Sequence, residues 1–68
     1  MSIGKNIRRI RRNHGVSQWQ LSQAIGLSPG AMRMIENGSR KCTSEMIKEI
    51  ASVLDVSEAE IRGNEGRR

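Results

Sequence analysis

Cysteine, proline and aromatic residues are scarce in this sequence of 68 residues, which contains one Cys, one Pro and one Trp and neither Phe nor Tyr. The single cysteine, Cys42, excludes an intramolecular disulfide, although a disulfide between two chains stays open. One cysteine and one histidine, His14, are too few to build an ordinary zinc site from Cys and His ligands. We therefore expect no metal and no other cofactor, and we expect a reducing compartment.

Long hydrophobic stretches are also absent. No segment approaches the roughly 18 apolar residues that a membrane-spanning helix needs, and the charged N-terminus lacks the continuous apolar run of a signal peptide. These absences predict a cytoplasmic protein without a membrane partner. Catalysis is not expected either, because Cys42 has no neighbouring base and His14 falls where a helix should end. A redox-sensing role for Cys42, beside Arg40 and Lys41, remains an alternative.

Positive charge dominates, and it is unevenly distributed. The net charge is +5 and the sequence pI is about 10.7. The first 13 residues carry five cations and no acid, whereas residues 45–61 hold five acids against Lys48. Such a distribution favours a polyanion as the partner, although a solvated surface that keeps the protein in solution is the plainer interpretation.

Apolar spacing and start and stop residues predict an all-α domain over residues 1–62, followed by a disordered basic tail over 63–68. The first helix should run to Asn13 and carry an apolar stripe of Ile3, Ile7 and Ile10. The later helices should begin after Ser17, after Ser28, after Thr43 or Ser44, and after Ser57. Ala24 and Ile25 are expected on the inner face of the second helix, and Ile61 lies in the short fifth helix.

Arg11 and Glu36 stand beside the apolar stripes of the first and third helices. A charge at such a place is partly buried and needs a counter-ion. We therefore expect these two side chains to form a buried or half-buried ion pair that joins the two helices.

Residues Gln18 to Asn37 have the spacing of a helix-turn-helix. Counting from Gln18, the fifth place, where the helices cross, has the small Ser22, and the ninth, in the turn, has Gly26. Apolar residues occupy the fourth, eighth, tenth, fifteenth and eighteenth places, namely Leu21, Ile25, Leu27, Met32 and Ile35. The pattern predicts a DNA-binding unit, and an ordinary helical hairpin is the alternative.

Over residues 3–61 the chain resembles the Cro and repressor type (XRE-like) of helix-turn-helix transcriptional regulators. The segments that carry the resemblance include Ile7-Arg8-Arg9-Ile10-Arg11, Leu21-Ser22-Gln23-Ala24-Ile25-Gly26, Ile35-Glu36-Asn37-Gly38 and Leu54-Asp55-Val56-Ser57. The resemblance implies a compact five-helix bundle that binds double-stranded DNA, with the third helix in the major groove. It departs from the common pattern at Pro29 and Gly30, where relatives often carry polar side chains.

The resemblance also implies roles for individual residues. The base-reading set comprises Ser28, Gly30, Arg33 and Met34, with Arg33 suited to guanine. A phosphate contact and a free surface arginine are the alternatives for Arg33. The phosphate-binding set comprises Ser17, Gln18, Trp19, Asn37, Arg40, Lys41 and Thr43. Trp19 has alternatives, since it could instead pack under the first helix or meet a protein.

A single reading helix covers few base pairs, so we expect a homodimer on a palindromic operator. The expected dimer interface comprises Val53, Asp55, Val56, Ser57, Glu58 and Ile61. Repression is the simplest mechanism, and activation from the same surface is equally compatible with the sequence. A different class stays open: a protein-interaction module, such as an antitoxin or an adapter, that uses the helical bundle for docking.

Overall fold

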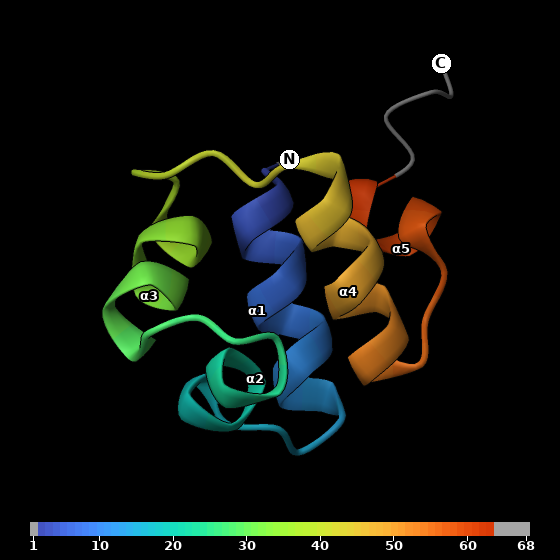
Figure 1. Ribbon diagram of the computed structural model, residues 1–68. Helices are drawn as coiled ribbons and strands as arrows, with labels where there is room; N and C mark the ends of the chain where they lie inside the picture. Colours follow the sequence, from blue (N-terminus) through green and yellow to red (C-terminus); the bar gives the residue numbers. More distant parts are fainter. Residues whose placement is uncertain (1, 64–68) are drawn as a thin grey trace.

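In the computed structural model, which describes residues 2–63, the chain is a bundle of helices, and the described part contains no strand. The helices are α1 (Ile3–Asn13), α2 (Gln18–Ala24), α3 (Pro29–Asn37), α4 (Ser44–Leu54) and α5 (Glu58–Arg62). α1 lies in the middle of the bundle, between α3 on one side and α4 and α5 on the other (Figure 1). The predicted all-α fold is confirmed.

Each helix is preceded by a capping serine or threonine, whose hydroxyl accepts a hydrogen bond from the backbone N–H three residues later. The capping residues are Ser2, Ser17, Ser28, Thr43 and Ser57. Reciprocal capping boxes form at Ser17 with Gln20 and at Ser57 with Glu60. Because these contacts are local, the helix starts could be read from the sequence, and the structure shows that Thr43, not Ser44, caps α4.

The core is built around α1, which contacts each of the other four helices. It is almost entirely aliphatic and comprises Ile7, Ile10, Leu21, Met32, Ile35, Ile47, Ile50, Ala51, Leu54 and Ile61. Ala24, expected to face inward, is exposed, and Ile25 is only partly buried. Both line a hollow between α2 and α4. The buried residues of α2 are Leu21 and Ser22, and Ile25 packs against the core from the end of the helix.

The structure removes Ile61 from the expected dimer interface. Its side chain is fully buried in the core of its own protomer, so it offers no surface to a second copy. The reason is that α5 is short and Ile61 is its one large apolar residue, so burying that residue is what attaches the helix. Asn6 of α1 reinforces the attachment, since its side-chain Nδ2 donates a hydrogen bond to the Ile61 carbonyl oxygen at 3.0 Å.

Gly4 sets the approach of α1 to α3. A Cβ atom at this position would collide with the carbonyl oxygens of Ile35 and Glu36. The absence of a side chain therefore lets the two helices touch backbone to backbone, and this contact brings Glu36 over the side chains of α1.

The end of the chain differs from the prediction by one residue. Gly63, expected to begin the tail, has φ of 77° and forms the C-cap of α5. The remaining expected tail, residues 64–68, lies outside the described residues. Between residues 2 and 63, no helix has both the length and the hydrophobicity required to cross a bilayer.

Candidate nucleic-acid interface

The α2–turn–α3 unit has the geometry expected from its spacing. Gly26 turns the chain with φ of 75°, and the Leu27 N–H donates a 2.9 Å hydrogen bond to the Ser22 carbonyl oxygen. Ser22 is fully buried, and its Oγ donates to the Trp19 carbonyl oxygen at 2.7 Å. A larger residue at Ser22 would push the two helices apart, which explains why the pattern requires a small side chain there.

The predicted contact between Arg11 and Glu36 is present, and it is nearly inaccessible to solvent. The Arg11 Nε and Nη2 atoms donate to the two carboxylate oxygens of Glu36 at 2.8 and 3.0 Å. The side chains are 9% and 0% exposed, respectively. The third nitrogen, Nη1, donates to the Val16 carbonyl oxygen at 2.9 Å. Every polar group of the pair is therefore satisfied, as a buried ion pair requires.

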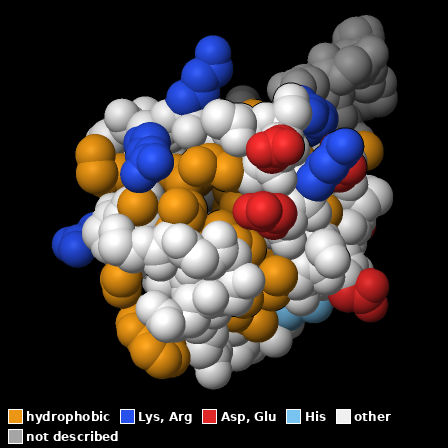
Figure 2. Space-filling model, viewed as in Figure 1, with side chains coloured by type: hydrophobic (Ala, Val, Ile, Leu, Met, Phe, Trp, Pro, Cys, Tyr) orange, Lys and Arg blue, Asp and Glu red, His pale blue; other side chains and the backbone are white. Residues whose placement is uncertain are grey.

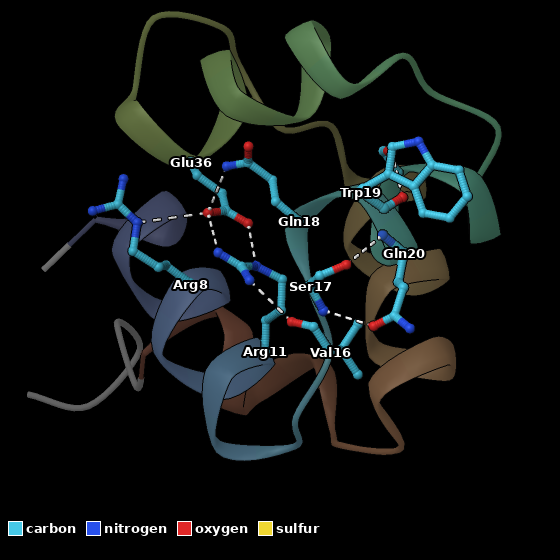
Figure 3. A network of polar contacts seen from close by, with 9 residues as sticks. Arg8, Arg11, Val16, Ser17, Gln18, Trp19, Gln20 and Glu36 are labelled. Carbon is cyan, nitrogen blue, oxygen red and sulfur yellow. Dashed lines mark hydrogen bonds and ion pairs between the residues drawn. The ribbon is translucent and has the colours of Figure 1, made fainter.

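Two further side chains reach the same carboxylate, and sequence reasoning missed both contacts (Figure 3). Gln18 Nε2 donates to Glu36 Oε1 at 3.2 Å, and Arg8 Nε lies 3.5 Å from that oxygen. Glu36 thus joins α1, α2 and α3 at one point. The spacing of Arg8, three residues before Arg11 on the same helix, was a signal for its contact.

The outward face of α3 is accessible along its length. Arg33, Met34 and Asn37 are exposed, and Gly30 is partly exposed near the start of the helix. The Ser28 hydroxyl accepts the Ala31 N–H as a cap and keeps its own proton available for donation. Asn37 Oδ1 accepts the Ser39 N–H at 2.9 Å, which leaves the Asn37 amide nitrogen as a donor.

Cations and donors border this face on two sides. Gln18 stands at the start of α2, and Arg40, Lys41 and Thr43 follow α3 in an exposed connection. Within residues 2–63, no carboxylate lies within ion-pair distance of Arg33, Arg40 or Lys41. Their charge is therefore available to an anionic partner.

Trp19 is 59% exposed, so the alternative in which it packs under α1 is wrong. Its neighbour Ser17 is engaged as the α2 cap. An indole on the surface next to Gln18 presents a flat apolar face and one N–H donor.

The surroundings of Cys42 and His14 do not suit a redox or catalytic role. Burial raises the pKa of the Cys42 thiol, and the positive charge of Arg62 partly offsets this effect. A raised pKa is opposite to what a redox-sensing thiolate needs. The His14 ring Nδ1 lies 2.9 Å from the Ile10 carbonyl oxygen at the end of α1. In the described part of the chain, no group of three or more His, Cys, Asp or Glu side chains could hold a metal ion.

The expected dimer residues other than Ile61 lie on or near the surface. Val53 is 41% exposed and Asp55 is exposed, while Val56 and Glu58 are partly buried and Ser57 caps α5. Figure 2 shows acidic side chains gathered over α4 and apolar ones between α2 and α4. Val53 borders that apolar region, which it shares with Ala24 and Ile25.

Comparison with known proteins agrees with this geometry. The family model described as helix-turn-helix matches residues 7–61. The chain belongs to the helix-turn-helix family. The predicted resemblance to Cro and repressor-type regulators is thereby confirmed, and this helix-turn-helix protein is a DNA-binding transcriptional regulator.

Several relatives are similar over most of this helix-turn-helix chain. It is 33% identical to the HTH-type transcriptional regulator YazB of Bacillus subtilis, over 85% of this chain and 84% of YazB. It is 32% identical to antitoxin PezA of Streptococcus pneumoniae over 93% of this chain, but it spans only 40% of that protein. The crystal structure of the clp gene regulator ClgR from C. glutamicum matches with a TM-score of 0.82 and 27% identity, covering 97% of this chain and 91% of that one.

Proposed function

We propose that this regulator binds a specific palindromic operator in double-stranded DNA as a homodimer, with α3 in the major groove. The observation that carries the proposal is the accessible face of α3, bordered by Gln18 on one side and by Arg40 and Lys41 beyond its end. A helix enters the major groove readily, and cations beside it meet the two flanking phosphate strands.

Arg33 is the main base reader. It lies on the exposed face of α3, forms no ion pair with another described residue, and has the fork of donors that matches O6 and N7 of guanine. Met34 contacts a thymine methyl group, and the Ser28 hydroxyl donates to a base edge. Gly30 presents no side chain and allows the backbone to approach the bases.

Because few side chains read bases directly, part of the specificity comes from the shape and deformability of the DNA. The phosphate contacts fix the register in which α3 lies. They come from the groups bordering α3, namely Ser17, Gln18, Trp19, Asn37, Arg40, Lys41 and Thr43.

Dimerisation places two copies of α3 in successive major grooves, about 34 Å apart. The proposed interface comprises Val53, Asp55, Val56, Ser57 and Glu58, and exposed Val53 is its apolar centre. A dimer seated on an operator that overlaps a promoter represses transcription by excluding polymerase.

Selection of bound duplexes from a random library, at about physiological salt, tests the proposal. We expect an enriched palindrome whose half-sites are about one helical turn apart, centre to centre. Enrichment of a single unpaired site would contradict the homodimer. Binding without enrichment would contradict sequence specificity, and the absence of binding would contradict the proposal as a whole.

The second candidate is a protein-docking module, supported by the similarity to antitoxin PezA and by the exposure of Trp19. The dependence of binding on salt concentration distinguishes the two functions. Neutralising phosphates releases counter-ions, so DNA binding weakens steeply as the salt concentration rises, whereas docking onto a protein depends on salt much less.

A further inference from the structure

The outer face of α1 carries a row of cations that the base-reading and phosphate-binding sets do not use. Lys5, Arg9 and Arg12, which we call the α1 ridge, are all exposed. Their spacing of four and three residues places them on one side of the helix, spread over about 10 Å. Among residues 2–63, no carboxylate lies within ion-pair distance of any of the three. The ridge is therefore a local concentration of uncompensated positive charge.

Arg8 connects the α1 ridge to the proposed phosphate contacts. Arg8 and Gln18 both lie against Glu36 Oε1, at 3.5 and 3.2 Å, and they approach it from either side in Figure 3. Arg8 also lines one hollow together with Lys5, Arg9 and Arg12, so it links the ridge to the surface that should meet DNA.

Arg8 also adds positive charge to this junction. Arg11 already neutralises Glu36 through two short hydrogen bonds, whereas the Arg8 side chain is 41% exposed and holds the carboxylate loosely. Two guanidinium groups thus face one carboxylate, so the surface that joins the ridge to Gln18 is positive as well.

The charge of the ridge is suited to phosphate. Lys5, Arg8, Arg9, Arg12 and Asn13 line a shallow hollow of about 310 Å³, and four of these five side chains end in a cationic group. A row of cations that no described carboxylate neutralises is suited to a regular polyanion.

We propose that the α1 ridge binds the phosphate backbone of the same duplex, beyond the base pairs that α3 reads. The inference rests on the proposed function, because it requires the protein to be seated on DNA through α3. It extends the contact by up to three phosphates that carry no base information, so it raises affinity without changing the preferred sequence.

The test compares two lengths of the duplex enriched in the selection. One duplex ends at the outermost enriched base pair, and the other extends about one helical turn further at each end with unrelated sequence. Binding is measured over a range of salt for the wild type and for the triple variant Lys5→Gln, Arg9→Gln and Arg12→Gln. Arg12→Gln is also compared with Lys48→Gln, since each variant removes one positive charge and Lys48 is an exposed cation of α4. Circular dichroism establishes that all variants are helical, as expected for glutamine on an exposed helix face.

We expect the wild type to bind the extended duplex about tenfold or more tightly than the trimmed one, and the triple variant to lose that difference. The salt slope of the dimer on the extended duplex should fall by up to about 5, since each of the two ridges contacts up to three phosphates and each phosphate contributes about 0.9. Arg12→Gln should weaken binding to the extended duplex more than Lys48→Gln does. If the triple variant loses affinity equally for both duplexes, or if Arg12→Gln and Lys48→Gln have equal effects, the proposed role of the ridge is wrong and the proposed function is unaffected. A wild type that binds neither duplex would overturn both.

Discussion

Replacing Glu36 with alanine should destabilise the protein severely, because the change strands a buried cation. The Glu36 side chain is fully buried, and both of its oxygens are held by Arg11. Without the carboxylate, Arg11 keeps a single partner in the structure, the Val16 carbonyl oxygen. Breaking a buried pair by removing one member costs about 3–5 kcal/mol.

That cost is large for a chain of this size. A stability of about 0.05–0.15 kcal/mol per residue gives roughly 3–10 kcal/mol for the whole domain. Glu36→Ala should therefore remove between a third and all of the free energy of unfolding. Since about 1 kcal/mol lowers the Tm of a domain this small by about 4–8 °C, the expected decrease is on the order of 20 °C.

Thermal unfolding followed by circular dichroism measures the effect. Glu49→Ala, at an exposed position of α4, is the matched control and should change stability by less than about 0.5 kcal/mol. A double variant, Arg11→Met with Glu36→Leu, should be much more stable than Glu36→Ala, because it removes the stranded charge and fills the space with apolar groups. If Glu36→Ala melts at the wild-type temperature, then Arg11 is not held by Glu36 in solution and the reasoning fails.

Three other predictions concern separate parts of the molecule. Arg33→Ala should cost about 1–3 kcal/mol of binding and relax preference at one base pair per half-site; an equal loss on every sequence, in a competition binding assay, would make Arg33 a phosphate contact. Gly4→Ala should lower the free energy of unfolding, measured in urea, by about 1–3 kcal/mol, because the added Cβ meets the α3 backbone. Gly30→Ala, which has open space around it, should leave stability unchanged or raise it. Equal effects of the two substitutions would mean that α1 and α3 are not in close contact. Cys42 should react with iodoacetamide more slowly in the folded than in the urea-unfolded protein between pH 7 and 9, since its raised pKa lowers the thiolate fraction; the reverse order of rates would contradict the raised pKa.

The sequence by itself determined the helices and the helix-turn-helix. Caps such as Ser17 with Gln20 act over three residues, and apolar periodicity shows which side of a helix such as α1 faces the core. The Arg11–Glu36 contact could also be predicted, because each charge lay at the edge of an apolar stripe and needed a counter-ion.

The tertiary structure alone decided what depends on how the helices cross. Burial of Ile61 and exposure of Ala24 both followed from where neighbouring helices cover a face, which periodicity does not specify. The convergence of Arg8 and Gln18 on Glu36 required α1, α2 and α3 to meet at one carboxylate, a meeting that the close approach at Gly4 permits. Local interactions specify elements, whereas contacts between elements far apart in sequence appear only once the packing angles are set.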